Sequence, residues 1–156
     1  MLIYYFARSG RKVKSCVFFG HRAGNYEDVE GRFKEILIHL IENEGVTEFY
    51  SGGRGAFDQL GARLVAELKV RYSHIKITRV LSYIPKEKEE YTPLYFDDSV
   101  YLLERQVPAR YAIIETNKLL ADKADFIISG VKYPFGGAAQ AVAYAKKKKN
   151  VIELYE

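Results

Sequence analysis

The sequence predicts an α/β domain in which a mostly parallel sheet of about five strands lies between two layers of helices. Short β-type apolar runs alternate with longer stretches of helical periodicity. Glycine-rich turns follow three of these runs. Strands and helices alternating at such intervals are typical of parallel strands joined by right-handed crossovers. We therefore expect a single three-layer domain of the Rossmann-like type.

Each element follows from its own pattern of apolar residues. The expected strands are residues 15–19, 48–50, 75–81, 126–129 and 151–154. The first expected helix carries a stripe of apolar residues at helical spacing: Val29, Phe33, Ile36, Leu37, Leu40 and Ile41. The later helices are expected from residue 56 to about Arg71, over 110–121 and over 138–148.

Two segments lack a clear period. Residues 82–108 are rich in proline and tyrosine and are interpreted as a loop excursion carrying one short helix. Residues 1–14 form a basic extension, in which 2–6 is either an additional edge strand or part of a flexible arm. The Rossmann-like domain is accordingly assigned to residues 15–156.

Composition limits the class of protein. The 156 residues are 48% hydrophobic and 28% charged, which favours one folded domain over disorder. Cys16 is the only cysteine, so no intrachain disulfide and no cysteine-rich metal site can form. No apolar run approaches the length of a membrane span. A cytoplasmic location without membrane association is expected.

The net charge of +4 is unevenly distributed. Arg8, Arg11, Lys12 and Lys14 precede the first acidic residue and account for the whole excess, so the rest of the chain is close to neutral. A second basic run, 146–149, ends the last expected helix. It is either a solvated helix end, where cations meet the negative end of the dipole, or a contact with a nucleic-acid backbone.

The turn SGGRGAFD, residues 51–58, lies between an expected strand and an expected helix. Three glycines within four positions let a ligand approach the main chain, and the helix that follows directs its positive end toward the same place. Arg54 adds a cation that can bind phosphate or carboxylate through two hydrogen bonds. A tight βα loop without a ligand is the alternative. The turns after Phe19 and Ser129 also follow strands, so all three are expected to meet at one crevice where the strand order reverses.

Four segments together resemble the YpsA-like branch of the SLOG superfamily, which comprises Rossmann-like relatives of the DNA-processing protein DprA and of the LOG, or lysine decarboxylase-like, proteins. The segments are FFGHR at 18–22, SGGRGAFDQLGA at 51–62, RYAIIETNKLLADKADFII at 110–128 and FGGAAQAVAYAKKKKNVIEL at 135–154. The resemblance implies recognition of a nucleotide or a nucleotide-derived small molecule.

The same resemblance argues against LOG-type hydrolysis. LOG-type phosphoribohydrolases carry a PGGxGTxxE motif whose glutamate stands near the reacting sugar. Here the matching stretch is FGGAAQAVA, in which Gln140 replaces the threonine and Ala143 stands in place of the glutamate. Alanine cannot move a proton or stabilise a cationic sugar. We therefore expect binding without this hydrolysis, and no catalytic residue is assigned.

The candidate ligand-binding residues lie in the three turns, in the helix before the fourth strand and ahead of the last helix. They are Gly20, His21, Arg22, Ser51, Gly52, Gly53, Arg54, Gly55, Asp58, Arg110, Asn117, Tyr133, Gly136, Gly137 and Ala138. The N–H groups of 52–55 and 136–138 are expected to hold phosphate, which Arg22 and Arg54 neutralise. Asp58 or Asn117 would read ribose or base, and Tyr133 would stack on a base. Ordinary surface turns and helix-surface polar residues are the competing interpretation.

Other chemistries find less support. No His or Cys pair has metal-ligand spacing, no G-x-S-x-G elbow is present, and the turn at 51–58 lacks the lysine and hydroxyl of a P-loop. The sequence thus predicts a protein that senses or sequesters a nucleotide or ADP-ribose-like ligand, and no cofactor is assigned. Thirteen tyrosines leave amphipathic surface for an interface, which is compatible with a homo-oligomer. An N-glycosidase or nucleotide hydrolase with altered residues, and a DprA-like single-strand nucleic-acid binder, remain alternatives.

Overall fold

A six-stranded sheet with every neighbouring pair parallel forms the centre of the molecule. The computed structural model describes residues 13–84 and 94–155. The strand order is β4-β3-β2-β1-β5-β6. The strands are β1 (Lys14–Gly20), β2 (Val46–Ser51), β3 (Lys76–Leu81), β4 (Asp98–Tyr101), β5 (Phe126–Gly130) and β6 (Val151–Glu153).

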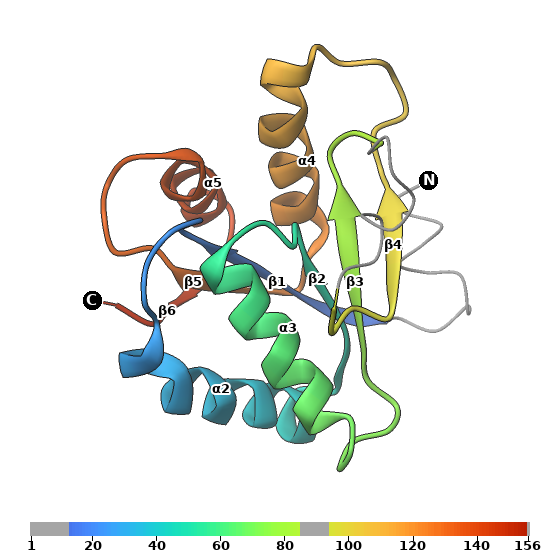
Figure 1. Cartoon of the computed structure of the whole chain (residues 1–156), viewed down its shortest axis with the longest axis vertical. Coiled ribbons are helices and arrows are strands. Elements are labelled where there is room, and N and C mark those ends of the chain that lie inside the picture. The colour runs from blue at the N-terminus through green and yellow to red at the C-terminus, as the bar shows by residue number, and fades with distance from the viewer. Residues whose placement is uncertain (1–12, 85–93, 156) are drawn as a thin grey trace.

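Helices cover both faces of this sheet (Figure 1). The helices are α2 (Glu30–Asn43), α3 (Ala56–Leu68), α4 (Ala109–Lys123) and α5 (Gly137–Lys146), and the short 3-10 turn Glu27–Val29 precedes α2. Helices α2 and α3 lie on one side, and α4 and α5 lie on the other. The predicted three-layer Rossmann-like domain with a parallel sheet is confirmed, with six strands in place of about five. Within the described residues, no helix is long and apolar enough to cross a membrane.

The alternation of side chains along β1 divides the core in two. Cys16 and Phe18 pack on the side of α2 and α3, whereas Val17 and Phe19 pack on the side of α4 and α5. All four are buried, as expected for a central parallel strand covered on both faces. The carboxyl end of β1 is thus fixed from both sides of the sheet.

The strand order reverses between β1 and β5. From β1 the chain moves outward through β2 and β3 to the edge strand β4, and it then returns to pair β5 with the opposite side of β1. The segments that follow β1 and β5 therefore lead to helices on opposite faces of the sheet, which leaves a crevice beyond the carboxyl ends of the two strands.

The sequence interpretation missed β4. This strand lies inside 82–108, and it pairs with β3 through Asp98–Thr78 to Tyr101–Leu81. It is a four-residue edge strand, Asp98–Tyr101, with no fully buried residue, so it carries neither the length nor the buried pattern of a central strand. Among 82–84 and 94–108 no helix is present, and the rest of the excursion lies outside the described residues. Helix α3 ends at Leu68, before the expected Arg71. Of the basic extension, residues 1–12 also lie outside the described residues, and β1 begins at Lys14.

Candidate functional site

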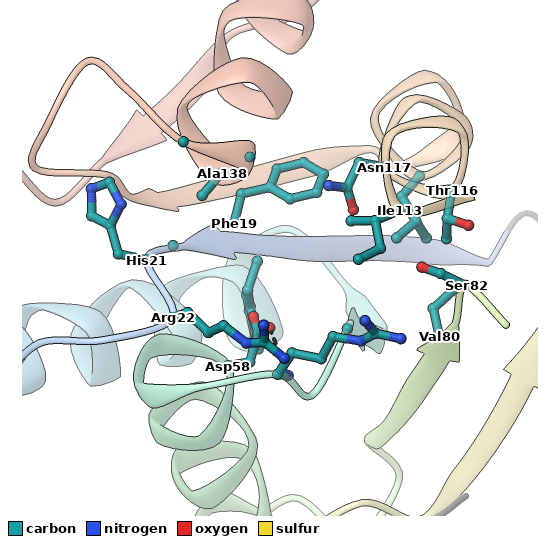
Figure 2. Close-up of a pocket in the computed structure, with 17 residues that line it drawn as sticks. Phe19, His21, Arg22, Asp58, Val80, Ser82, Ile113, Thr116, Asn117 and Ala138 are labelled. Atoms are coloured by element: carbon teal, nitrogen blue, oxygen red, sulfur yellow. Dashed lines mark hydrogen bonds between the residues drawn. The ribbon is translucent and has the colours of Figure 1, made fainter. Parts of the chain in front are cut away.

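A cleft of about 350 Å³ opens where the strand order reverses. Its walls come from the ends of β1 and β3, the loop before α3, one side of α4 and the first turn of α5. Figure 2 shows His21 at one end of the cleft and Ser82 and Thr116 toward the other. Sequence-predicted residues that line it are Gly20, His21, Arg22, Gly52, Arg54, Asp58, Asn117, Gly136, Gly137 and Ala138. All three predicted turns therefore reach one cleft.

The first turn of α5 presents main-chain donors to the cleft. Gly136 is the N-cap residue with a φ of 96°, and no side chain caps this end of the helix. Its carbonyl accepts the N–H of Gln140, which starts the helical hydrogen bonds. The preceding N–H groups of Gly137 and Ala138 have no acceptor within the helix, and both residues line the cleft. This end of α5 is suited to an anion.

The loop before α3 differs from expectation, because two of its N–H groups are used by the protein itself. The N–H of Gly53 donates to Oγ of Ser51 at 3.3 Å, and the N–H of Arg54 donates to Oδ2 of Asp58 at 3.1 Å. Ser51 is buried and does not line the cleft. The expectation that the amides of 52–55 jointly hold phosphate therefore fails for Gly53 and Arg54.

Two predicted glycines are needed for packing. A Cβ on Gly55, whose φ is 112°, would overlap the backbone of Arg22, whose carbonyl accepts the N–H of Ala56 at 2.8 Å. A Cβ on Gly20 would overlap the ring of Phe57. Gly55 does not line the cleft, so its role is to bring the first and second turns together.

The carboxyl of Asp58, which lines the cleft, has a raised pKa. Burial raises the pKa of its carboxyl to about 6, although the hydrogen bonds from the Arg54 N–H and the Ser51 hydroxyl favour the charged form. The charges of Arg54 and Arg79 act in the same direction as these hydrogen bonds. Near neutral pH this carboxyl is therefore able to exchange a proton.

The arginines of this region are held by contacts that orient them. The guanidinium of Arg54 lies 4.4 Å from the centre of the Tyr83 ring. Nε of Arg79 donates to the carbonyl of Gly52 at 3.3 Å and supports the loop from the side of β3. In Figure 2 the Arg22 side chain extends toward the cleft beside Asp58.

His21 connects the first turn to the third. Its Nε2 accepts the backbone N–H of Lys132 at 2.8 Å and that of Tyr133 at 3.1 Å. Burial lowers the pKa of the imidazole, and the charge of Lys132 lowers it further, so the neutral ring is favoured. Two donors on Nε2 place the ring proton on Nδ1. His21 thus fixes the loop that leads into α5.

Besides Ser51 and Gly55, three predicted residues lie outside the cleft lining: Arg110, Tyr133 and Gly53. Arg110 is exposed at the start of α4, where its guanidinium lies 4.8 Å from the ring of Tyr111. Tyr133 is 53% exposed beyond His21, with ring centres 5.2 Å apart. Gly53 also falls outside the lining, and its φ of 68° with Arg79 alongside explains the absence of a side chain.

The sequence interpretation missed the less polar part of the cleft, formed by Val80, Ser82, Ile113, Thr116 and Leu120. The α4 members stand four and one residues before Asn117 and three after it, which is the spacing of one helix face. The sequence alone therefore places Ile113, Thr116 and Leu120 on the same helix face as Asn117. Val80 and Ser82 follow from the rule that strand ends meet at one edge of a parallel sheet.

Other chemistry is not assembled in the described part of the chain. Residues 13–84 and 94–155 contain no group of three His, Cys, Asp or Glu side chains that could hold a metal ion. Ala143, which stands where the LOG-type motif has glutamate, is exposed and outside the cleft lining.

Three solved structures of similar fold were compared with the chain. DNA processing protein A (DprA) from Streptococcus pneumoniae has a TM-score of 0.65 at 14% identity, and the matched region covers 91% of this chain and 50% of the DprA chain. DprA from Helicobacter pylori, described with a single-stranded DNA binding mode, has a TM-score of 0.61 at 14% identity, and the match covers 90% of this chain and 64% of that DprA chain. The molybdenum cofactor binding protein from Rippkaea orientalis has a TM-score of 0.60 at 14% identity, and the match covers 92% of this chain and 77% of that protein's chain.

These neighbours share the fold of this chain, so the Rossmann-like fold expected from the resemblance is confirmed. No protein-family model and no curated protein matches the sequence. The likeness at 14% identity concerns the fold, and the site has to be argued from the residues of the cleft.

Proposed function

We propose that the chain binds a nucleotide or a nucleotide-derived small molecule, such as an ADP-ribose-like compound, in this cleft. The observation that carries the proposal is the joining of an uncapped helix N-terminus with an apolar wall in one cavity. Gly137 and Ala138 supply main-chain donors at one end, and Val80, Ile113 and Leu120 supply an apolar surface toward the other. An anionic group joined to a flat ring matches both parts.

Each part of such a ligand has a chemical partner. The phosphate is assigned to the first turn of α5, with Arg22 and Arg54 as the neutralising cations. The amide of Asn117 can donate to and accept from a base edge, and Asp58 can hydrogen-bond a ribose hydroxyl. The Rippkaea orientalis neighbour, described as binding the molybdenum cofactor, supports small-molecule binding as one use of this fold.

Calorimetry with nucleoside mono- and diphosphates and with linear and cyclic ADP-ribose tests this function. We expect at least one ligand to bind, and we expect Arg22→Gln to weaken its binding about 10- to 150-fold, as for loss of a charge-assisted contact worth about 1.5–3 kcal/mol. Arg110→Gln, at the exposed start of α4 and outside the cleft lining, is the matched control and should leave affinity unchanged. Absence of binding by every compound at millimolar concentration would contradict the proposal.

A hydrolase acting on the N-glycosidic bond of a nucleotide is a second candidate, favoured by the raised pKa of Asp58. A carboxyl that titrates near pH 6 is suited to general acid or base work. Release of free base from a nucleoside monophosphate, lost in Asp58→Asn, would establish it. Intact nucleotide after long incubation would leave binding as the function.

Single-strand nucleic-acid binding through the basic run 146–149 has less support. Lys146 pairs with Glu153 at 2.7 Å, Lys148 pairs with Asp122 at 2.8 Å, and Lys149 donates to the carbonyls of Asp122 and Ala124. These amines are already engaged by the protein. The observation favours the helix-end interpretation of this run.

A further inference from the structure

Two aromatic side chains stand exposed beyond the His21 end of the cleft. The rings of Tyr133 and Phe135 are stacked, with centres 5.6 Å apart and planes 13° from parallel. Their residues are 53% and 69% exposed. We call this pair the aromatic platform. Large apolar rings that stay exposed while stacked in parallel offer a flat surface to another ring.

The platform is continuous with the proposed anion site. Phe135 directly precedes Gly136, the N-cap residue of α5, and the Tyr133 ring lies 5.2 Å from the ring of His21, which lines the cleft. The N-terminus of α5, to which the phosphate is assigned, therefore directly follows the platform in the chain, and His21 contacts both the platform and the cleft.

The platform is also held in place before any ligand binds. The N–H groups of Lys132 and Tyr133 both donate to Nε2 of His21, and Nζ of Lys132 donates to the carbonyl of Asn25 at 2.6 Å. These bonds tie the loop to the turn after β1. A preordered surface loses less conformational entropy on binding.

The size of the cleft also favours a second ring-binding surface outside it. At about 350 Å³ it lies at the low end of the range for ligand pockets, so it suits one nucleoside and its phosphate rather than two nucleosides. A second ring attached through the phosphate would have to lie outside the cleft, on the side of α5 where the platform stands.

We propose that the aromatic platform, Tyr133 and Phe135, binds the second base of a dinucleotide-type ligand whose bridging phosphates lie at the N-terminus of α5. This inference rests on the proposed function and specifies its ligand class: two ring systems joined through phosphate. A free dinucleotide is favoured over a nucleic-acid strand because the amines of Lys146, Lys148 and Lys149 are engaged within the protein.

Calorimetry with two matched ligands tests the inference. ADP-ribose and diadenosine diphosphate share adenosine, pyrophosphate and a second ribose, and only the latter carries a second base. Stacking of one base is worth about 1–3 kcal/mol, so we expect diadenosine diphosphate to bind about 5- to 150-fold more tightly. Phe135→Ala should abolish this preference and leave ADP-ribose affinity unchanged, whereas Phe135→Tyr should retain it.

Tyr111→Ala removes an exposed aromatic side chain from α4, outside the cleft lining, and is the control variant. Equal affinities of the two ligands for the unaltered protein, or equal weakening of both by Phe135→Ala, would overturn the platform while leaving the proposed function standing. Failure of both ligands to bind would overturn the platform, and the proposed function would fall with it only if the nucleoside mono- and diphosphates also failed to bind. Tighter binding of a ten-residue oligo(dA), with steep salt dependence, would overturn the platform in favour of nucleic acid.

Discussion

Nε2 of His21 accepts the backbone N–H of Lys132 at 2.8 Å, although the two residues are 111 positions apart in the chain. The bond joins the turn after β1 to the turn after β5, across the point where the strand order reverses. Because Nε2 also accepts the N–H of Tyr133, a single neutral imidazole holds two consecutive amides of the loop that leads into α5.

Protonation of His21 should release this loop. The imidazolium has no acceptor left on Nε2, and the folded-state pKa lies below the ordinary value of 6.5. The stabilising contribution is therefore present above pH 6.5 and is lost as the pH falls through the folded-state pKa. Hydrogen exchange, corrected for the intrinsic effect of pH, should show falling protection of the Lys132 and Tyr133 amides in this range.

His21→Ala should produce the same loss of protection at pH 7.5 and remove the pH dependence. His74→Ala, at an exposed position, is the control for removal of an imidazole. Unchanged protection in His21→Ala would show that the loop is held by other contacts.

Gly20→Ala should destabilise the protein by about 1–3 kcal/mol or more, because its new Cβ would overlap the ring of Phe57. Gly31→Ala is the matched control: a Cβ there meets nothing within 4 Å, and alanine favours a helix by about 0.5–1 kcal/mol. Urea unfolding of both variants measures the difference. Equal stabilities of the two variants would contradict the packing described for Gly20.

Asp58→Asn should stabilise the protein above pH 6. A folded-state pKa of about 6 against 3.8 means that the folded protein binds the proton more tightly, so stability falls as the pH rises from 3.8 to 6. Above that range the cost reaches about 3 kcal/mol, at 1.36 kcal/mol for each unit of pKa. Asparagine cannot ionise but keeps an oxygen for the Arg54 N–H.

Urea unfolding between pH 4 and 8 checks this prediction. The difference between the variant and the unaltered protein should grow with pH up to about 6 and then stay constant. A difference independent of pH would show that Asp58 has an ordinary pKa in the folded protein.

Lys149→Met should destabilise the protein by about 1 kcal/mol, because Nζ donates to the carbonyls of Asp122 and Ala124 at the end of α4. Lys147→Met is the matched control in the same basic run, at an exposed position. Thermal unfolding of the two variants separates a structural lysine from a solvated one. Oligonucleotide affinity that falls equally in both would instead indicate a nucleic-acid surface.

Much of the fold could be read from local periodicity, and the exceptions have physical reasons. β1 and α2 were predictable because their apolar residues recur at strand and helix spacing and are buried. β4 was not, because it is only four residues long, is not buried and is ordered by its pairing with β3 at the edge of the sheet.

The site was predictable in outline and less so in detail. Glycine turns at strand ends indicated one cleft, but the pattern SGGRG could not show that Ser51 and Asp58 accept the loop's own N–H groups. Nor could it distinguish Gly136, with open space around its position, from Gly20, whose missing side chain makes room for Phe57. These differences depend on which side chains from other parts of the chain pack against each turn in the folded protein.

The ring of Phe57 has a mechanical consequence for the cleft. A Cβ on Gly20 or on Gly130, which face each other in β1 and β5, would overlap this one ring, so α3 is wedged against two strand ends at once. The wall built from α3 and the sheet is therefore tightly packed where the two strands end. We expect any widening of the entrance to come from the opposite wall, where α4 and the start of α5 stand.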